Sequence, residues 1–346
     1  MKKAFLLLCA ALLALGCVLP SAGYALARAA LGKAEEAPAV GSDAEGQAEP
    51  GGLGGLAPQQ NAAAPADADA EVFRVEDSGT GQLTEVPRRE YLIGAVAAEM
   101  PITWPDEALK AQAIAAHSYV LYCRDHCADP SGAWLTADPA RRQGYLTDAV
   151  LRSYWGTAYE ANYARLSALV DEVLTKVLYY DGAPAGTSYF AISNGRTEAS
   201  ENVWGAALPY LTAVDSSADS SAENYEYTVV YSVEQIRQLL TDGLGLTPDV
   251  SAPERWFGAP EMTPSGYVAR LPVCGQSVAG TTLRRVLGLR SACFAISYQA
   301  DGFHIVTRGY GHGVGLSQWG AKALAEQGQS FAQILAHYFP GTELRG

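Results

Sequence analysis

The sequence is short of positive charge. Its 346 residues include 24 Lys and Arg against 37 Asp and Glu, which gives a formal net charge of −13. A protein that recognises nucleic acid or an anionic membrane by charge needs the opposite balance, so we expect neither partner. The composition is compatible with a neutral polymer or another protein as the partner. The length allows one large domain or two modest ones.

Large apolar side chains are nearly absent from residues 32–70, which consist mainly of Ala, Pro, Gly, Gln and acidic residues. Such a segment cannot bury enough apolar surface to fold, so we predict a disordered linker. The folded part is therefore expected to cover residues 71–346.

The first 31 residues have the opposite character. Two lysines precede an apolar run from Ala4 to Leu19. The segment is an uncleaved membrane anchor, a secretory signal cut after the small residues that end at Ala27, or a lipoprotein signal with Cys17 as the lipid acceptor. With the lysines held inside, all three interpretations place the rest of the chain outside the cytoplasm.

Residues 71–346 mix helical and strand patterns, which predicts an α+β fold with short elements around a substrate cleft. The run "VPRREYLIGAVAAEMP" predicts a helix, and a second helix follows with Thr103 as N-cap and Asp106 completing a capping box. Hairpins are predicted at Asp181-Gly182 and Asp301-Gly302. Further N-caps are expected at three serines: Ser232, Ser317 and Ser330.

Glu99 is an acidic residue in an otherwise apolar run, directly before Met100 and Pro101. At a helix C-terminus and among apolar side chains, both the helix dipole and burial disfavour the ionised carboxylate and raise its pKa. A raised pKa suits a general acid that works near neutral pH. The alternative interpretation is a surface carboxylate that faces water.

Two further stretches could contact a ligand. In "SNGRTEASENVWG", Ser193, Asn194, Gly195 and Thr197 offer hydrogen-bonding groups near an aromatic residue, as sugar sites do, although ordinary turns share this composition. In "RGYGHGVGLSQWGA", glycines on both sides of His312 let a ligand approach the backbone closely. No Gly-Lys-Ser/Thr follows, which argues against a phosphate-binding loop. A solvated loop histidine is the alternative there.

Cysteine is scarce, with six residues in the chain. Cys123, His126 and Cys127 lie close together, but they offer three ligands at a spacing that matches no common zinc site. A Cys–His protease is a weaker alternative. In an exported protein a disulfide such as Cys274–Cys293 is also compatible with the sequence, which cannot assign the partners.

Three motifs in order resemble the stage II sporulation protein D family, which also contains the amidase enhancers. They are "AAEMPITWPDEALKAQAIAAHSY", "SNGRTEASENVWGAALPYL" and "GYGHGVGLSQWGAKALAEQGQSFAQILAHYFPG", and together they span nearly all of residues 86–346. The resemblance implies a lytic transglycosylase that cleaves peptidoglycan glycan strands stripped of stem peptides. It also implies a cell-wall amidase as partner during engulfment in sporulation.

The resemblance implies a mechanism with one carboxyl group, since the family's catalytic glutamate falls on Glu99. Ordinary glycosidases use two carboxylates. A lytic transglycosylase instead lets the C6 hydroxyl of N-acetylmuramic acid attack its own C1, which leaves a 1,6-anhydro end. Glu198 is a weaker candidate for a helper. The expected substrate-binding residues are Lys110, His117, Ser193, Asn194, Gly195, Thr197, His312, Ser317 and Gln318.

The sequence departs from the family pattern at two places. His117 stands where the family has an arginine, so affinity or pH dependence is expected to differ. Some members bind zinc through Cys and His-Cys ligands, and the corresponding residues here are Thr136, Arg141 and Arg142. We therefore predict no metal and no other cofactor. The main alternative function is a non-catalytic amidase enhancer that binds glycan and activates an amidase.

Overall fold

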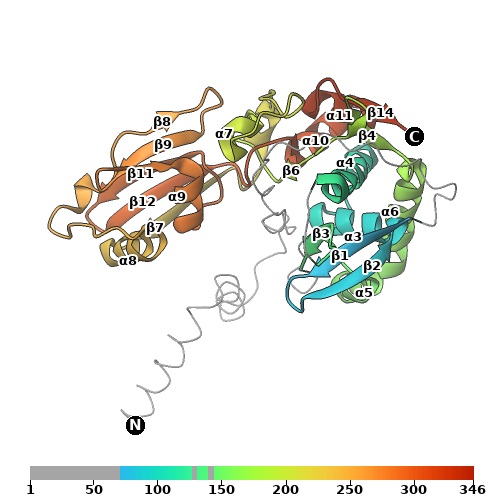
Figure 1. Ribbon diagram of the computed structural model, residues 1–346, viewed down its shortest axis with the longest axis horizontal. Coiled ribbons are helices and arrows are strands. Elements are labelled where there is room, and N and C mark those ends of the chain that lie inside the picture. The colour runs from blue at the N-terminus through green and yellow to red at the C-terminus, as the bar shows by residue number, and fades with distance from the viewer. Residues whose placement is uncertain (1–70, 127–130, 139–143) are drawn as a thin grey trace, which may run out of the picture. The chain divides into compact units, whose positions relative to one another are not determined.

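The structure, a computed structural model, describes residues 71–126, 131–138 and 144–346. All of them belong to one structural unit. They form an α+β fold of short helices and small sheets, which confirms the predicted class (Figure 1). The predicted anchor and linker lie outside the described residues. Within the described part of the chain, no helix is long and apolar enough to cross a membrane.

The first part of the fold combines a three-stranded sheet, in the order β2-β1-β3, with four helices. Strand β1 pairs antiparallel with β2 and parallel with β3. The elements are β1 (Val72–Asp77), β2 (Gln82–Pro87), α3 (Arg88–Glu99), α4 (Asp106–His126), β3 (Leu135–Ala137), α5 (Asp148–Trp155) and α6 (Tyr159–Val173).

Helix α4 lies at the centre of the larger hydrophobic core. It packs against α3 and α6 and also against α10 (Gln318–Glu326) and α11 (Phe331–Tyr338) from the end of the chain. Ala108, Ala111 and Ala115 on α4 are fully buried, and their small side chains allow neighbouring backbones to approach closely. The hydroxyl of Thr187, for example, donates to the carbonyl oxygen of Ala115 at 2.7 Å.

Short strands bring distant segments to this helical core. β4 (Val177–Tyr180) and β5 (Ala183–Pro184) form the hairpin predicted at Asp181-Gly182, where both residues have positive φ, and β14 (Glu343–Arg345) pairs with β4. β6 (Tyr189–Phe190) pairs in parallel with β13 (Leu316–Ser317). Because of this pairing, the loop that follows β6 lies beside the start of α10. Helix α7 (Ser200–Trp204) comes after that loop.

Residues 226–308 form a second, smaller hydrophobic core between two three-stranded sheets and two helices. The sheets have the strand orders β11-β12-β7 and β10-β9-β8, and they lie on the opposite side of α7 from α4 (Figure 1). The predicted hairpin near Asp301-Gly302 joins β11 to β12. The elements are β7 (Glu226–Tyr231), α8 (Val233–Leu244), β8 (Glu261–Met262), β9 (Val268–Val273), β10 (Gln276–Ala279), α9 (Gly280–Val286), β11 (Phe294–Gln299) and β12 (Gly302–Arg308).

The predicted caps at Ser232, Ser317 and Ser330 are confirmed, and the first and third form complete capping boxes. The N-cap predicted at Thr103 and its capping box with Asp106 are wrong, because α4 begins only at Asp106. Residues 101–104 form a turn in which the N–H of Trp104 donates to the carbonyl oxygen of Pro101. Arg165 on α6 stabilises this turn by donating to the Trp104 carbonyl and to the Asp106 carboxylate.

Candidate functional site

Glu99 is the last residue of α3 and is buried, with only 5% of its surface exposed. The helix ends there because Met100 adopts an extended conformation and Pro101 follows. The interpretation of Glu99 as a solvated surface carboxylate is therefore wrong. Its carboxyl group has lost most of its water, as the sequence argument for a general acid requires.

The carboxyl group of Glu99 receives a hydrogen bond from the far end of the chain. Nε2 of Gln318 donates to its Oε2 at 3.0 Å. Burial raises the pKa of Glu99 to about 7, and the hydrogen bond from Gln318 opposes the rise. Within the described part of the chain, no other hydrogen bond reaches this carboxyl group. Glu99 can therefore exchange a proton near neutral pH.

Gln318 is held in place as the first residue of α10. Ser317 caps this helix, since its hydroxyl oxygen accepts from the N–H of Gly320 at 3.3 Å. The same hydroxyl donates to Oδ2 of Asp219 at 2.7 Å. The predicted residues Ser317 and Gln318 thus have different functions, because Ser317 fixes the helix start and Gln318 contacts Glu99.

Asp219 is a buried carboxylate that the sequence analysis missed. Its Oδ2 accepts from the backbone N–H of Ser193 at 2.6 Å and from the hydroxyl of Ser216 at 3.2 Å, in addition to Ser317. Burial raises its pKa to about 6 despite these hydrogen bonds. Asp219 therefore ties the loop after β6 to the start of α10. It lies in the stretch "DSSADSS", which looks like an ordinary polar loop and carries no signal of this role.

The loop at Ser193 is bound internally rather than open. The side-chain amide of Asn194 donates to the Ser265 carbonyl at 2.9 Å, and its oxygen accepts from the Arg196 N–H. The hydroxyl of Thr197 donates to the Thr212 carbonyl, and its oxygen accepts from another backbone N–H. Gly195 has a φ of 108°, which favours glycine. The polar groups predicted to bind substrate thus shape this loop.

Glu198, the candidate helper, is also fully engaged. Its side chain is buried, and its Oε1 accepts from the Ala199 N–H at 2.8 Å and from Asn202 at 2.9 Å. Its Oε2 accepts from the hydroxyl of Thr263. Three donors thus bind the carboxylate of Glu198, and none of these hydrogen bonds connects it to Glu99.

His312 uses both ring nitrogens within the protein. Its Nδ1 accepts from the Val314 N–H, so Nε2 carries the proton and donates to the Tyr189 carbonyl, each at 3.1 Å. The ring lies 5.5 Å from Phe190 and 5.4 Å from Trp204, centroid to centroid. Burial lowers its pKa to about 3. His312 is therefore a neutral residue that orders the glycine-rich loop, and only its ring surface is left for a ligand.

Lys110 and His117 are hydrogen-bonded away from Glu99. Nζ of Lys110 forms ion pairs with Glu172 at 2.5 Å and with Glu107 at 3.2 Å. Nδ1 of His117 donates to the Lys176 carbonyl at 3.0 Å, and its buried ring lies near Phe73. Burial lowers the pKa of His117 to about 3. The structure thus joins Glu99, Ser193, Ser317 and Gln318 in one cluster and leaves Lys110 and His117 outside it.

The cysteine and metal predictions fall partly outside the structure. Cys127, Arg141 and Arg142 lie outside the described residues, and Thr136 lies in β3. Cys274 and Cys293 are free thiols, so the disulfide between them is not formed. Among the described residues, no group of three His, Cys, Asp or Glu side chains is placed to hold a metal ion.

Two tryptophans, one shortly after Glu99 and one directly after Gln318 in the sequence, are in contact in the structure. The rings of Trp104 and Trp319 lie edge to face at 5.9 Å, and Nζ of Lys322 lies 4.5 Å from the Trp319 ring. Trp319 directly follows Gln318, and Trp104 closes the turn after Glu99. Trp104 is buried and Trp319 is partly exposed, and a partly exposed indole provides an apolar surface for a ring-shaped ligand.

The fold and the site define an α+β protein with a single-carboxyl candidate acid/base site, assembled from the ends of two helices far apart in sequence. The chain belongs to the stage II sporulation protein D family, which confirms the resemblance. Residues 76–180 match the family model described as stage II sporulation protein. Over 261 residues the chain is 36% identical to Stage II sporulation protein D of Bacillus subtilis strain 168, covering 75% of this chain and 74% of that protein.

Two further relatives extend the comparison. The Stage II sporulation protein D of Bacillus amyloliquefaciens is also 36% identical, with the same coverage of both chains. A protein named Amidase enhancer from Bacillus subtilis strain 168 is 27% identical over 307 residues, which cover 73% of this chain and 40% of that protein. The names of these relatives place the family in sporulation and associate one member with an amidase.

Proposed function

We propose that this protein is a lytic transglycosylase that cleaves the bond between N-acetylmuramic acid and N-acetylglucosamine in peptidoglycan strands denuded of stem peptides. The observation that carries the proposal is the state of Glu99. It is a buried carboxyl group with a pKa of about 7 and one amide donor. A catalytic group that first gives and then takes a proton works best with a pKa near the working pH.

The reaction needs one carboxyl group. Protonated Glu99 gives its proton to the glycosidic oxygen as the bond to C1 of the muramic acid residue breaks. The C6 hydroxyl of the same sugar attacks C1, and the Glu99 carboxylate takes the proton of that hydroxyl. The product carries a 1,6-anhydro ring, and Glu99 is protonated again. The internal hydrogen bonds of Glu198 support a mechanism without a second carboxylate.

The protein is proposed to act outside the cytoplasm, held at the membrane by residues 1–31 and separated from it by the linker at 32–70, or else secreted after signal cleavage. Its proposed partners are peptidoglycan glycan strands and a cell-wall amidase of the engulfment machinery. Fractionation of cells that produce the full chain, followed by protease treatment of intact protoplasts, tests this placement. Protection from the protease would contradict it.

A non-catalytic amidase enhancer is the second candidate, favoured by the relative of that name. Both candidates predict glycan binding, but they differ in the products. The purified chain is incubated with denuded strands and with intact peptidoglycan, and the fragments are analysed by mass spectrometry. Glu99→Gln is the test variant, and Glu198→Gln is a matched control because it also removes a buried carboxylate.

Anhydro-ended fragments from denuded strands, lost in Glu99→Gln and retained in Glu198→Gln, are the expected result. No fragments from the unmodified chain, together with faster release of stem peptides by an added amidase, would exclude the transglycosylase and leave the enhancer.

A further inference from the structure

Arg290, between α9 and β11, is a partly buried arginine that packs against two tyrosines. Its guanidinium carbon lies 3.9 Å from the centre of the Tyr227 ring and 5.3 Å from that of the Tyr310 ring. Its carbonyl oxygen accepts from the N–H of Gly311 at 2.9 Å. Tyr227 belongs to β7, and the other two residues belong to the glycine-rich loop. These contacts fix the guanidinium beside that loop.

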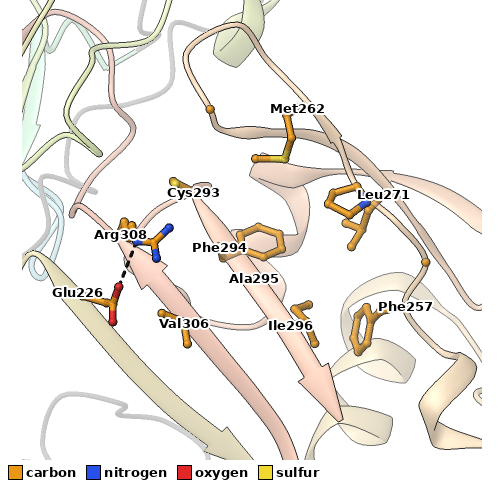
Figure 2. A pocket seen from close by; sticks show the side chains of 13 residues that line it. Glu226, Phe257, Met262, Leu271, Cys293, Phe294, Ala295, Ile296, Val306 and Arg308 are labelled. Carbon is orange, nitrogen blue, oxygen red and sulfur yellow. Dashed lines mark hydrogen bonds and ion pairs between the residues drawn. The ribbon is translucent and has the colours of Figure 1, made fainter.

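The charge of Arg290 is not balanced by a protein group. Among the residues that the structure describes, no acidic side chain pairs with Arg290 and no hydrogen bond reaches its guanidinium. Figure 2 shows that Arg308 differs, because it forms an ion pair with Glu226 at 3.1 Å at one end of a largely apolar pocket. A guanidinium that is backed by aromatic rings and keeps its N–H donors free matches a planar carboxylate, which it can bind with two parallel hydrogen bonds.

A second arginine adds positive charge at this place. Nε of Arg284, on α9, donates to the carbonyl oxygen of Arg290 at 3.3 Å. Burial is the main cause of the lowered pKa of His312, and the charge of Arg284 lowers it further. The positive charge of Arg284 therefore acts on the glycine-rich loop, and it favours an anion beside that loop.

The loop after β6 connects this guanidinium to the cluster at Glu99. Tyr310 forms two backbone hydrogen bonds with Ile192, at 2.6 Å and 3.0 Å. The N–H of Trp319, the residue after the amide donor to Glu99, donates to the carbonyl oxygen of Ala191 at 3.0 Å. Two consecutive loop residues thus lie between Tyr310 and Trp319, and segments paired in this way are roughly 5 Å apart. The separation is short enough for one bound polymer to reach both places.

The proposed substrate carries a matching group. Hydrolysis of the amide bond between the lactyl group of N-acetylmuramic acid and the stem peptide leaves a carboxylate on that lactyl group. The N-acetylated sugars themselves are neutral, so a stripped strand presents one negative charge on each muramic acid residue. In an intact strand the same lactyl group is an uncharged amide. A guanidinium without an acidic partner therefore distinguishes the two kinds of strand.

We propose that Arg290 binds the lactyl carboxylate of a muramic acid residue beyond the cleaved bond and thereby selects stripped strands. The inference rests on the proposed function, because it takes the substrate from there. It assigns to Arg290 a part in substrate selection and none in the chemical step. The guanidinium and the carboxylate form an ion pair with two hydrogen bonds, and no covalent bond changes.

The test measures binding of the full chain to two kinds of labelled strand by fluorescence anisotropy. The chain carries Glu99→Gln, so that strands are not cleaved during the measurement. One sample is stripped strands, and the other is the same strands with their lactyl carboxylates converted to neutral methylamides. We expect the conversion to weaken binding about tenfold or more, since it removes a charge-assisted hydrogen-bonded pair. This comparison needs no change at Arg290.

Arg290→Gln is the variant that removes the guanidinium. It should weaken binding to stripped strands about tenfold and abolish the difference between the two kinds of strand. Arg290→Lys keeps the charge but lacks the planar pair of donors, so its affinity should lie between the two. Arg255→Gln is the matched control, because it removes the same charge from a side chain that is 83% exposed. Circular dichroism checks that the variants fold.

Equal affinity for stripped and methylamide strands would overturn the proposal, as would absence of binding to stripped strands. An effect of the conversion that persists in Arg290→Gln would overturn it too, because the carboxylate would then bind elsewhere. An equal loss of affinity in Arg255→Gln would reduce the effect to net charge and would also overturn it.

Product analysis of the chain with Glu99 intact separates this proposal from the proposed function. Anhydro-ended fragments released at equal rates from both kinds of strand would overturn selection by Arg290 and leave the transglycosylase. Carboxylate-dependent binding without anhydro-ended fragments would exclude the transglycosylase and leave the site at Arg290.

Discussion

Replacing Glu99 with glutamine should make the stability of the protein less dependent on pH. The carboxyl group has an ordinary pKa of 4.5 and a folded-state pKa of about 7. The difference corresponds to about 3 kcal/mol of folding free energy, since one pKa unit equals about 1.4 kcal/mol. Glutamine is nearly isosteric with a protonated glutamate but never acquires the charge that burial penalises.

The direction follows from proton linkage. Between pH 4.5 and 7 the folded protein holds a proton on Glu99 that the unfolded chain has released. Stability therefore falls as the pH rises through this range and levels off above it. The contribution of protonated Glu99 is fully present below pH 4.5 and is lost above pH 7. Glutamine keeps this contribution at every pH. The free energy of unfolding of Glu99→Gln, relative to that of the unmodified protein, should therefore increase by about 3 kcal/mol between pH 4.5 and pH 7.

Urea denaturation of both proteins at intervals from pH 4.5 to pH 8.5 measures this difference. Glu160→Gln is the control for removal of a carboxylate, because the Glu160 side chain is 87% exposed. Stability curves for Glu99→Gln and the unmodified protein that run parallel across the range would refute the reasoning. They would mean that Glu99 titrates at its ordinary pKa, and Glu99 would then be a poor candidate for a general acid.

Three other predictions concern the same region. Gln318→Ala removes the hydrogen-bond donor that opposes the raised pKa of Glu99. The alkaline limb of the pH–rate profile on denuded strands should therefore move to higher pH, and the maximal rate should fall. A limb that does not move would contradict this prediction. Asp219→Ala leaves three donors without their acceptor and should cost about 3 kcal/mol in urea denaturation at pH 7, with a smaller loss for Asp219→Asn. His312 has a pKa of about 3, so NMR of its ring carbons should show no titration between pH 5 and pH 8, and a transition near pH 6.5 would disprove the assigned hydrogen bonds.

The sequence predicted the elements whose signals are local. Capping serines and two hairpin turns lie where the patterns indicated, because a cap or a turn depends on a few neighbouring residues. The start of α4 was mispredicted because its turn is bound by Arg165, which lies about sixty residues away along the chain. Tertiary contacts of this kind leave no trace in the local pattern.

The candidate site was predicted in part for the same reason. Apolar surroundings marked Glu99, and the resemblance marked Gln318, but only the fold shows that these residues meet across 219 positions. Asp219 escaped notice because a buried aspartate and a loop aspartate look alike in sequence. Asn194, Thr197 and His312 were chosen for their hydrogen-bonding groups, and the structure directs those groups into the protein. Their substrate contacts stay predictions.

The pKa of Glu99 reflects two helix ends with opposite effects. Glu99 ends α3, where the helix dipole is negative and disfavours a carboxylate, as burial does. Gln318 begins α10, where the dipole is positive and the amide donor favours the carboxylate. A group that must donate a proton and then recover one needs both forms to be accessible. Because Asp219 and Ser317 hold the start of α10, the balance depends on residues that never touch Glu99, and loss of either should change the pKa of Glu99 through Gln318.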